Sequence, residues 1–262
     1  MKDKSVWKVW DENNEYGEVF YKRATGQLPE MESSKAAAKL IKDDVTEGDK
    51  ILDVGCGSGH YLRSLRSALK INFFYTGVDA TSNYINLGKR AFVNDAGVDF
   101  CLGDIYNLPF DENSFDIVMC NNVLLHLPSI QKPLNELIRV SKKTVLIRTL
   151  IGDRSFRIQD VSPASEIEFN GDGEPTSFYY YNIYSQKYLN YLLKSSGKVN
   201  NFQIIKDVFF DPQNIESSTS EHRDAHNVTK IIGDFQVNGY IIQPWKFLKI
   251  NIIVPKNGNV LM

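Results

Sequence analysis

The first 150 residues of the chain alternate between short apolar runs and longer segments in which apolar residues recur at helical spacing. The apolar runs are typical of buried strands, and they lie within residues 51–54, 73–79, 98–105, 114–126 and 144–148. The helical patterns lie near residues 31–42, 61–69, 83–94 and 130–140. Strands that alternate with helices in this way predict an α/β fold, with a doubly wound parallel sheet between helices on both faces.

The pattern changes in the second half of the chain. A polar stretch rich in Gly, Pro and Ser covers residues 152–175, and we expect it to form a loop or a small insertion. A helical pattern at 184–193 and strand-like runs at 203–210 and 245–254 follow it. Residues 211–244 are too many for a tight hairpin, and loops of that length tend to be functional or disordered, so this segment is a candidate substrate lid.

Two clusters in this half carry candidate chemistry. The tyrosines of residues 178–184 offer apolar faces with polar tips, which suit recognition of a small organic ligand or sugar and equally suit a half-buried edge strand. His222 and His226 have a spacing that can bind a metal on a helix, but no third ligand or acidic motif accompanies them. We therefore predict no metal site and interpret both histidines as solvated surface residues.

Composition and charge narrow the class of protein. A chain of 262 residues with 42% hydrophobic content can bury a full core, and its net charge of −2 gives no electrostatic case for a nucleic-acid partner. We expect no membrane span and a cytoplasmic location, because the N-terminus lacks the apolar core of a secretion signal. The three cysteines, without a C-x-x-C pair, favour neither a disulfide framework nor a zinc site, and we expect Cys56 and Cys120 to line a cofactor cleft.

The most distinctive segment is an apolar run that ends in Asp53 and leads into Gly55, Gly57 and Gly59. Glycine adopts positive φ angles at little cost and has no side chain to hold a ligand away from the backbone. Where such a turn opens a helix, free N–H groups and the positive end of the helix dipole suit a carboxylate or a phosphate. The segment therefore predicts a turn that cradles a cofactor with an anionic group.

Asp53 to Gly59 resembles motif I of the class I methyltransferases that depend on S-adenosylmethionine (SAM). The G-x-G-x-G spacing differs from the G-x-G-x-x-G of dinucleotide-binding folds. Three later segments occur in that family's order, at residues 73–79, 98–105 and 114–126. The order of four segments makes the resemblance far stronger than a glycine turn alone.

The resemblance implies a Rossmann-like fold with a seven-stranded sheet, mostly parallel with an antiparallel last strand. It implies a single methyltransferase domain over residues 1–262. Within it we expect an N-terminal helical lid over residues 1–45 and a SAM-binding core over residues 46–150. Residues 151–262 would form a C-terminal half with insertions at 152–178 and 211–244 near the acceptor site.

The resemblance also implies SAM as the cofactor. Asp79, at the end of the second strand, is the expected ribose ligand, because a carboxylate can accept hydrogen bonds from both ribose hydroxyls. Asp104 is expected to face the exocyclic amine of adenine. The whole set expected to bind the cofactor is Asp53, Gly55, Cys56, Gly57, Asp79, Ala80, Asp104, Ile105 and Asn121, with Tyr16, Tyr21 and Arg23 from the N-terminal extension.

Each of these assignments has a structural alternative. An Asp at a strand end often caps the next helix or turn without any ligand, which applies to Asp79 before Thr81. In the N-terminal extension an aromatic ring can stack near the SAM sulfonium through cation–π attraction. The aromatic residues there, including Trp7, Trp10 and Phe20, can equally serve to pack the extension onto the domain.

His126 is the best-placed candidate for a general base, because histidine titrates near neutral pH. A structural histidine on an apolar turn is the alternative. The segment 121–124 lacks the Asn/Asp-Pro-Pro-aromatic pattern by which related enzymes grip a planar amino group, and the paired acids of magnesium-dependent catechol methylators are absent. We therefore expect methyl transfer from SAM to an O or N atom of a small-molecule acceptor.

Two other classes of protein share some of these features. A nicotinamide-dependent oxidoreductase would share a glycine turn and an acid after the second strand, but the turn's spacing, Asp104 and the lack of a hydride-transfer set oppose it. A non-catalytic SAM-binding protein, or a regulatory subunit of a methyltransferase complex, is compatible with the sequence, because an intact cofactor half does not establish an intact acceptor half.

Overall fold

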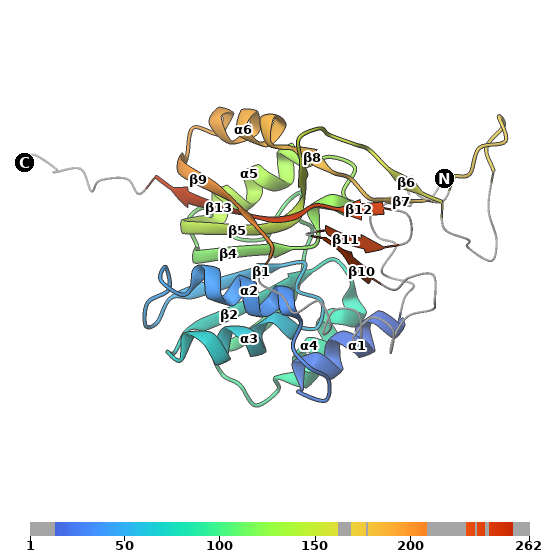
Figure 1. Cartoon of the computed structure of the whole chain (residues 1–262). Coiled ribbons are helices and arrows are strands. Elements are labelled where there is room, and N and C mark those ends of the chain that lie inside the picture. The colour runs from blue at the N-terminus through green and yellow to red at the C-terminus, as the bar shows by residue number, and fades with distance from the viewer. Residues whose placement is uncertain are drawn as a thin grey trace, which may run out of the picture.

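A computed structural model of the chain describes residues 14–161, 169–176, 178–208, 229–233, 235–238 and 241–253. Its centre is a sheet in the order β3-β2-β1-β4-β5-β13-β9 (Figure 1). These strands are β1 (Lys50–Val54), β2 (Phe74–Asp79), β3 (Val98–Leu102), β4 (Phe115–Asn121), β5 (Ser141–Gly152), β9 (Val199–Lys206) and β13 (Trp245–Ile252). The short strand β8 (Tyr184–Ser185) pairs in parallel with the end of β5.

The predicted Rossmann-like sheet is confirmed. The strands from β3 to β5 are parallel, and β13 runs antiparallel to both β5 and β9. Strands β1 and β4 read as nearly continuous apolar runs because both of their faces are covered by helices. Strand β8 was not expected and adds an eighth strand to the seven predicted.

Helices cover both faces of the sheet (Figure 1). One face carries α1 (Asn14–Ala24), α2 (Glu32–Ile41), α3 (His60–Leu69) and α4 (Ser82–Ala91). The other face carries α5 (Gln131–Val140) and α6 (Gln186–Ser195). The four helices predicted in the first half are all present, with ends that lie within three residues of the predicted ones.

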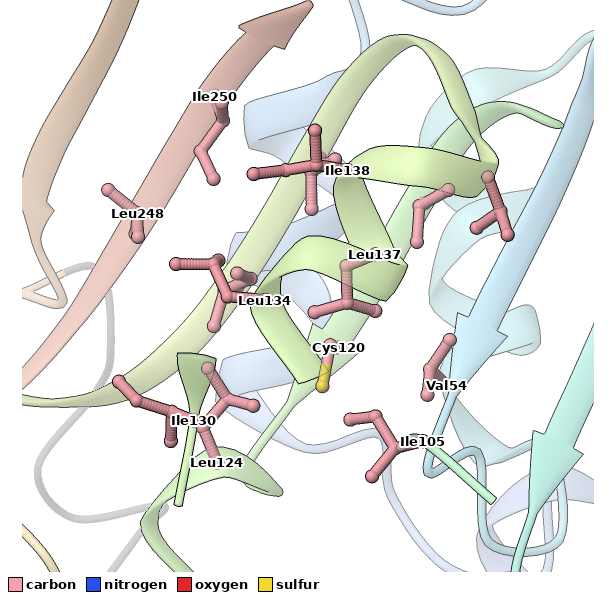
Figure 2. Close-up of a cluster of buried hydrophobic side chains, with 14 of the residues drawn as sticks. Val54, Ile105, Cys120, Leu124, Ile130, Leu134, Leu137, Ile138, Leu248 and Ile250 are labelled. Carbon is pink, nitrogen blue, oxygen red and sulfur yellow. The ribbon is translucent and has the colours of Figure 1, made fainter. Parts of the chain in front are cut away.

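The two faces have separate hydrophobic clusters. Figure 2 shows Leu134 and Ile138 of α5 lying toward Leu248 and Ile250 of β13, and Leu137 lying toward Cys120 of β4. Fully burying one such side chain contributes about 1.5–3 kcal/mol, so this face anchors the two C-terminal strands to the parallel core.

Cys120 lies in the same cluster and is fully buried (Figure 2). The expectation that it lines a cofactor cleft is wrong. Side chains alternate along a strand, and Cys120 points to the α5 face whereas Met119 packs on the opposite face.

The C-terminal insertions contain small sheets of their own. Strands β6 (Gln159–Asp160) and β7 (Tyr179–Tyr180) pair within the first insertion. Strands β10 (Thr229–Ile232), β11 (Phe235–Asn238) and β12 (Ile241–Gln243) form an antiparallel sheet in the second, which the sequence pattern presented only as a long loop. Figure 1 shows β10–β12 toward the end of the central sheet at which the parallel strands finish.

Candidate cofactor and active site

The predicted cofactor residues gather at the carboxyl ends of β1, β2 and β4. The chain order of the strands reverses between β1 and β4, and ligands of open α/β sheets bind at such a switch point. The η2 turn (Leu124–His126) follows β4 at the same edge. The site is thus where the fold itself provides a crevice.

The glycine turn has the backbone that the sequence predicted. Gly55, Gly57 and Gly59 have φ angles of +75°, +54° and +77°, and Gly59 is the residue from which α3 starts. A Cβ on Gly55 would lie 2.2 Å from Cγ2 of Val123, and one on Gly57 would lie 2.9 Å from Cδ2 of Phe20. Both the conformation and the close packing therefore require glycine at these positions.

Asp79 ties the end of β2 to this turn. Its Oδ2 accepts a hydrogen bond of 2.9 Å from the N–H of Gly57, and its Oδ1 accepts one of 2.9 Å from the N–H of Thr81. The contact with Thr81 is the capping contact of a strand-end Asp, and the contact with Gly57 reaches across to the cofactor turn. Each carboxylate oxygen has a further lone pair, so both contacts leave acceptor capacity for ribose hydroxyls. Ala80 follows, half-buried.

Asp53 lies buried at the end of β1. It is 2% exposed and accepts a hydrogen bond of 2.8 Å from the Tyr75 hydroxyl. Burial raises the pKa of its carboxyl to about 7, the hydrogen bond from Tyr75 opposes the shift, and the charge of Asp79 adds to it. Cys56, also buried, donates its Sγ–H to the carbonyl of Gly57 at 3.2 Å. These two buried side chains support the turn from the protein interior.

Asp104 and Ile105 follow β3. The Asp104 side chain is exposed and accepts a hydrogen bond of 2.8 Å from the N–H of Tyr106, whereas Ile105 is buried in the α5-side cluster. A solvent-accessible carboxylate on a fixed turn is suited to an amine such as that of adenine.

Asn121 at the end of β4 is 7% exposed, and neither its Oδ1 nor its Nδ2 has a hydrogen-bond partner among the residues that the structure describes. A buried amide without partners costs about 1–3 kcal/mol, and native proteins rarely leave one unexplained. The orphaned amide beside the glycine turn fits a polar group that a ligand brings. On these observations the residues present fit SAM.

The next residue, Asn122, is part of a network that the sequence did not predict. Its backbone is left-handed, with φ +62°, and its Oδ1 accepts from Nη1 of Arg148 at 2.5 Å. The Nε of Arg148 donates to Asp207 at 2.7 Å, and the guanidinium lies 3.9 Å from the ring centre of Trp245. In the sequence, an arginine at the end of an apolar run was a signal for the role of Arg148. No local pattern indicated the role of Asp207.

Helix α1 covers the glycine turn. The Phe20 ring stacks on the His60 ring with centres 4.5 Å apart, and Oγ of Ser58 donates to the carbonyl of Gly17 at 3.3 Å. Among the aromatics of the extension, Phe20 lies against the turn itself. Trp7 and Trp10 lie outside the described residues.

The three residues that the sequence singled out in the extension have different surroundings. The Tyr16 ring lies 6.3 Å from that of Phe20, and Arg23 lies close enough to His60 to lower its pKa. Tyr21 lies under the guanidinium of Arg90 on α4, at 4.1 Å. Tyr16 and Arg23 are thus near the turn, while the Tyr21 contact packs the extension onto the domain.

His126 in η2 is held by its neighbours. Its Nδ1 lies 2.9 Å from the carbonyl oxygen of Tyr180, which fixes that nitrogen as the donor, and its ring lies 5.7 Å from that of Tyr181. Burial lowers its pKa to about 4, and the hydrogen bond to Tyr180 opposes part of this shift. His126 is therefore neutral at physiological pH, with Nε2 in the acceptor state, but it is a weak base.

Burial lowers the pKa of His60 to about 3 from an ordinary 6.5, and Arg23 adds to the shift. Below pH 6.5 the unfolded chain binds a proton here that the folded chain does not, so stability falls as the pH falls from 6.5 toward 3. His60→Phe, which keeps a ring against Phe20, is expected to remove this loss. In urea unfolding, wild type should lose about 2 kcal/mol relative to the variant between about pH 7.5 and about pH 5. An equal loss in both proteins would contradict the assignment.

A family model described as a methyltransferase domain matches residues 45–168, which include β1 to β5 and every core residue of the site. A demethylmenaquinone methyltransferase of Staphylococcus epidermidis is 35% identical over 99 residues, which are 38% of this chain and 41% of that protein. One of Staphylococcus aureus is 34% identical over 114 residues, 43% of this chain and 47% of that protein. These matches support a class I SAM-dependent methyltransferase.

Solved structures of that family share the fold over most of this chain. Phosphoethanolamine N-methyltransferase 2 of Haemonchus contortus, in complex with SAM, covers 94% of this chain and 60% of its own at a TM-score of 0.60 and 17% identity. A putative methyltransferase in complex with the Haloferax volcanii Trm112 activator covers 89% of this chain and 94% of its own, at a TM-score of 0.56 and 18% identity. At these identities the likeness concerns the methyltransferase fold alone.

The described part of the chain offers neither a cluster of metal ligands nor a membrane-spanning helix. No group of three or more His, Cys, Asp or Glu side chains there is placed to hold a metal ion. No helix there is long and apolar enough to cross a membrane. His222 and His226 lie outside the described residues.

Proposed function

We propose that this methyltransferase moves the methyl group of SAM to an O or N atom of a small-molecule acceptor. The observation that carries the proposal is the glycine turn, whose Gly57 N–H is bound by the Asp79 carboxylate at the switch point of the sheet. Such a turn lets a ligand approach the backbone closely and leads into a helix N-terminus, which favours a ligand that bears a carboxylate, as SAM does.

Several residues would hold the cofactor. Asp79 would accept hydrogen bonds from the ribose hydroxyls, Asp104 would accept from the adenine amine, and Asn121 would bond to the amino-acid part. Gly55 and Gly57 allow the ligand to approach the backbone. The buried side chains of Asp53 and Cys56 support this turn from the protein interior. Helix α1, with Tyr16, Tyr21 and Arg23, would form the N-terminal side of the site.

Bound SAM supplies a methyl group that is already activated by its sulfonium. The protein then has to align the acceptor with that methyl group and keep water out. Asn122, fixed by Arg148, sets the shape of the loop after β4 beside which the acceptor would lie. If the acceptor loses a proton, Nε2 of His126 is the candidate base, although its low pKa makes geometry the larger contribution.

Support for an acceptor other than a macromolecule comes from charge and from relatives. The net charge of −2 does not favour a nucleic-acid partner, and the Staphylococcus relatives are named for a small-molecule substrate. The matched region is less than half of those relatives, so their substrate is not assigned to this chain. We further propose that residues 1–262 act as one domain with the acceptor site under the insertions at 152–178 and 211–244.

Methyl transfer is tested directly with tritium in the SAM methyl group. The proposal expects label to leave SAM for an acceptor and S-adenosylhomocysteine to accumulate in equal amount. The alternative, a non-catalytic SAM-binding subunit, expects cofactor binding with no label transferred to any acceptor class. The companion variant is His126→Gln, in which the amide can still make the hydrogen bond to Tyr180. If His126 is the base, the rate of methyl transfer should fall about 100-fold or more in this variant.

A further inference from the structure

Residues 179–183 lie between the first insertion and the η2 turn. One edge of this segment pairs with the chain that leads into β6, where the N–H groups of Tyr181 and Ile183 donate to backbone carbonyls at 2.9 and 3.0 Å. In an extended chain the N–H and C=O groups of successive residues point to opposite edges. Those of Tyr180 and Asn182 therefore point to the second edge, along which η2 lies.

This second edge holds the backbone on both sides of His126. The N–H of Asn182 donates to the carbonyl of Leu125 at 2.9 Å, and its Nδ2 donates to the carbonyl of Leu127 at 2.9 Å. The carbonyl of Tyr180 accepts from Nδ1 of His126 at 2.9 Å. Three hydrogen bonds thus fix the peptide groups that flank His126 and the orientation of its ring.

Tyr184 adds a contact of the same kind. Its hydroxyl donates to the carbonyl of Leu124 at 2.8 Å and accepts from Nδ2 of Asn182 at 3.4 Å. Asn182 and Tyr184 are 1% and 7% exposed, so water competes little for these bonds. A three-residue turn has few partners of its own for its last carbonyls, and here the insertion supplies the donors.

The amide of Asn182 also destabilises the fold on its other side. Its Oδ1 is buried and has no hydrogen-bond partner among the residues that the structure describes. A buried acceptor without a partner is unfavourable. An apolar side chain would avoid this penalty but would leave the carbonyl of Leu127 without its donor. Such exceptions to good packing are typical of functional sites, where a fixed geometry matters more than stability.

We infer that Asn182 is a positioning residue for methyl transfer, which acts through His126 and the turn after β4. This rests on the proposed function, in which the acceptor lies beside that turn and His126 is the candidate base. The bond from Nδ1 to Tyr180 leaves Nε2 as the acceptor nitrogen, and the bonds from Asn182 hold the ring in one place and one tautomer. Misplacing a reacting group by about 1 Å costs about 100-fold in rate, so a loosened turn lowers kcat without weakening the cofactor.

The state of His126 can be measured without an acceptor. In protein labelled with ¹⁵N-histidine, NMR of the ring nitrogens distinguishes the two tautomers, and the spectrum of His126→Gln identifies the signals of His126. The wild type is expected to carry the proton on Nδ1 alone. Asn182→Leu, which removes the donor to Leu127, should show both tautomers, while its affinity for S-adenosylhomocysteine stays unchanged.

Kinetics with the acceptor found by tritium transfer complete the test. In Asn182→Leu, kcat should fall at least about tenfold while the KM values for SAM and the acceptor stay those of the wild type. Tyr184→Phe removes one hydroxyl at nearly constant volume and should show a smaller loss of kcat. Tyr188→Phe is the matched control, because its ring lies 6.4 Å from that of Tyr184 and is 38% exposed. Its kcat should remain that of the wild type.

An unchanged kcat or an unchanged tautomer in Asn182→Leu overturns the inference, and so does an equal loss of kcat in Tyr188→Phe. A fall in the affinity for S-adenosylhomocysteine as large as the fall in kcat also overturns it, because it marks damage to the whole domain. If Asn182→Leu does not fold, an unchanged kcat in Tyr184→Phe decides against the inference. A wild-type protein that binds S-adenosylhomocysteine but transfers label to no acceptor overturns the proposed function instead.

Discussion

Asp79→Ala is expected to weaken the binding of S-adenosylhomocysteine about 100-fold or more. A carboxylate that accepts two ribose hydroxyls makes charge-assisted hydrogen bonds of about 1.5–3 kcal/mol each, and each 1.4 kcal/mol is a factor of about ten. The variant also loses the bond to Gly57, which shapes the turn, so both losses act in the same direction. Isothermal titration of the variant and the wild type measures the change.

Asp104→Ala provides the comparison for this experiment. Its carboxylate is exposed and would meet a single amine, so the expected loss is about tenfold. Thermal unfolding of both variants shows whether the fold is retained. An affinity of Asp79→Ala within about twofold of the wild type would leave only the capping role of this residue, in which it accepts from Thr81.

Arg148→Met is expected to lower the free energy of unfolding by about 3–5 kcal/mol. The change leaves Asp207 as a buried charge without its partner, since the two side chains are 6% and 2% exposed and lie 2.6 Å apart at Nη2 and Oδ2. Urea denaturation measures the loss. The double variant Arg148→Met/Asp207→Leu should regain most of it, because a buried pair replaced by apolar side chains is often neutral.

A surface pair supplies the control for this prediction. Lys35 and Glu32 are bridged at 2.7 Å on α2, with the lysine side chain 48% exposed, so Lys35→Met should cost less than about 1 kcal/mol. A loss of that small size in Arg148→Met would show that the buried network does not stabilise the domain. A double variant no more stable than the single one would show that Asp207 is not the charge that matters.

The cofactor half could be predicted from the sequence because its signals are local. The acid and the glycines that bind or shape the turn are within seven residues of one another, and Asp79 and Asp104 each end a recognisable apolar run. The chain direction of parallel strands then brings such ends to one edge of the sheet. Periodicity likewise placed the helices, whose apolar faces repeat every three to four residues.

The acceptor half could not be predicted, because its contacts join residues far apart in the chain. Arg148 meets Asp207 only because β9 pairs with β13 and β13 with β5. Strand β9 begins at Val199, before the predicted run, because an edge strand tolerates the polar residues at its start. The bond from Asn182 to the turn after β4 likewise joins residues 55 positions apart, and no local pattern marks it.

The central claim, a SAM site at the glycine turn, is tested most directly by isothermal titration of the protein with S-adenosylhomocysteine, with NAD as the parallel ligand. We expect S-adenosylhomocysteine to bind and NAD not to bind. Tighter binding of NAD, or no binding of S-adenosylhomocysteine, would contradict the functional account while leaving the α/β fold unchanged.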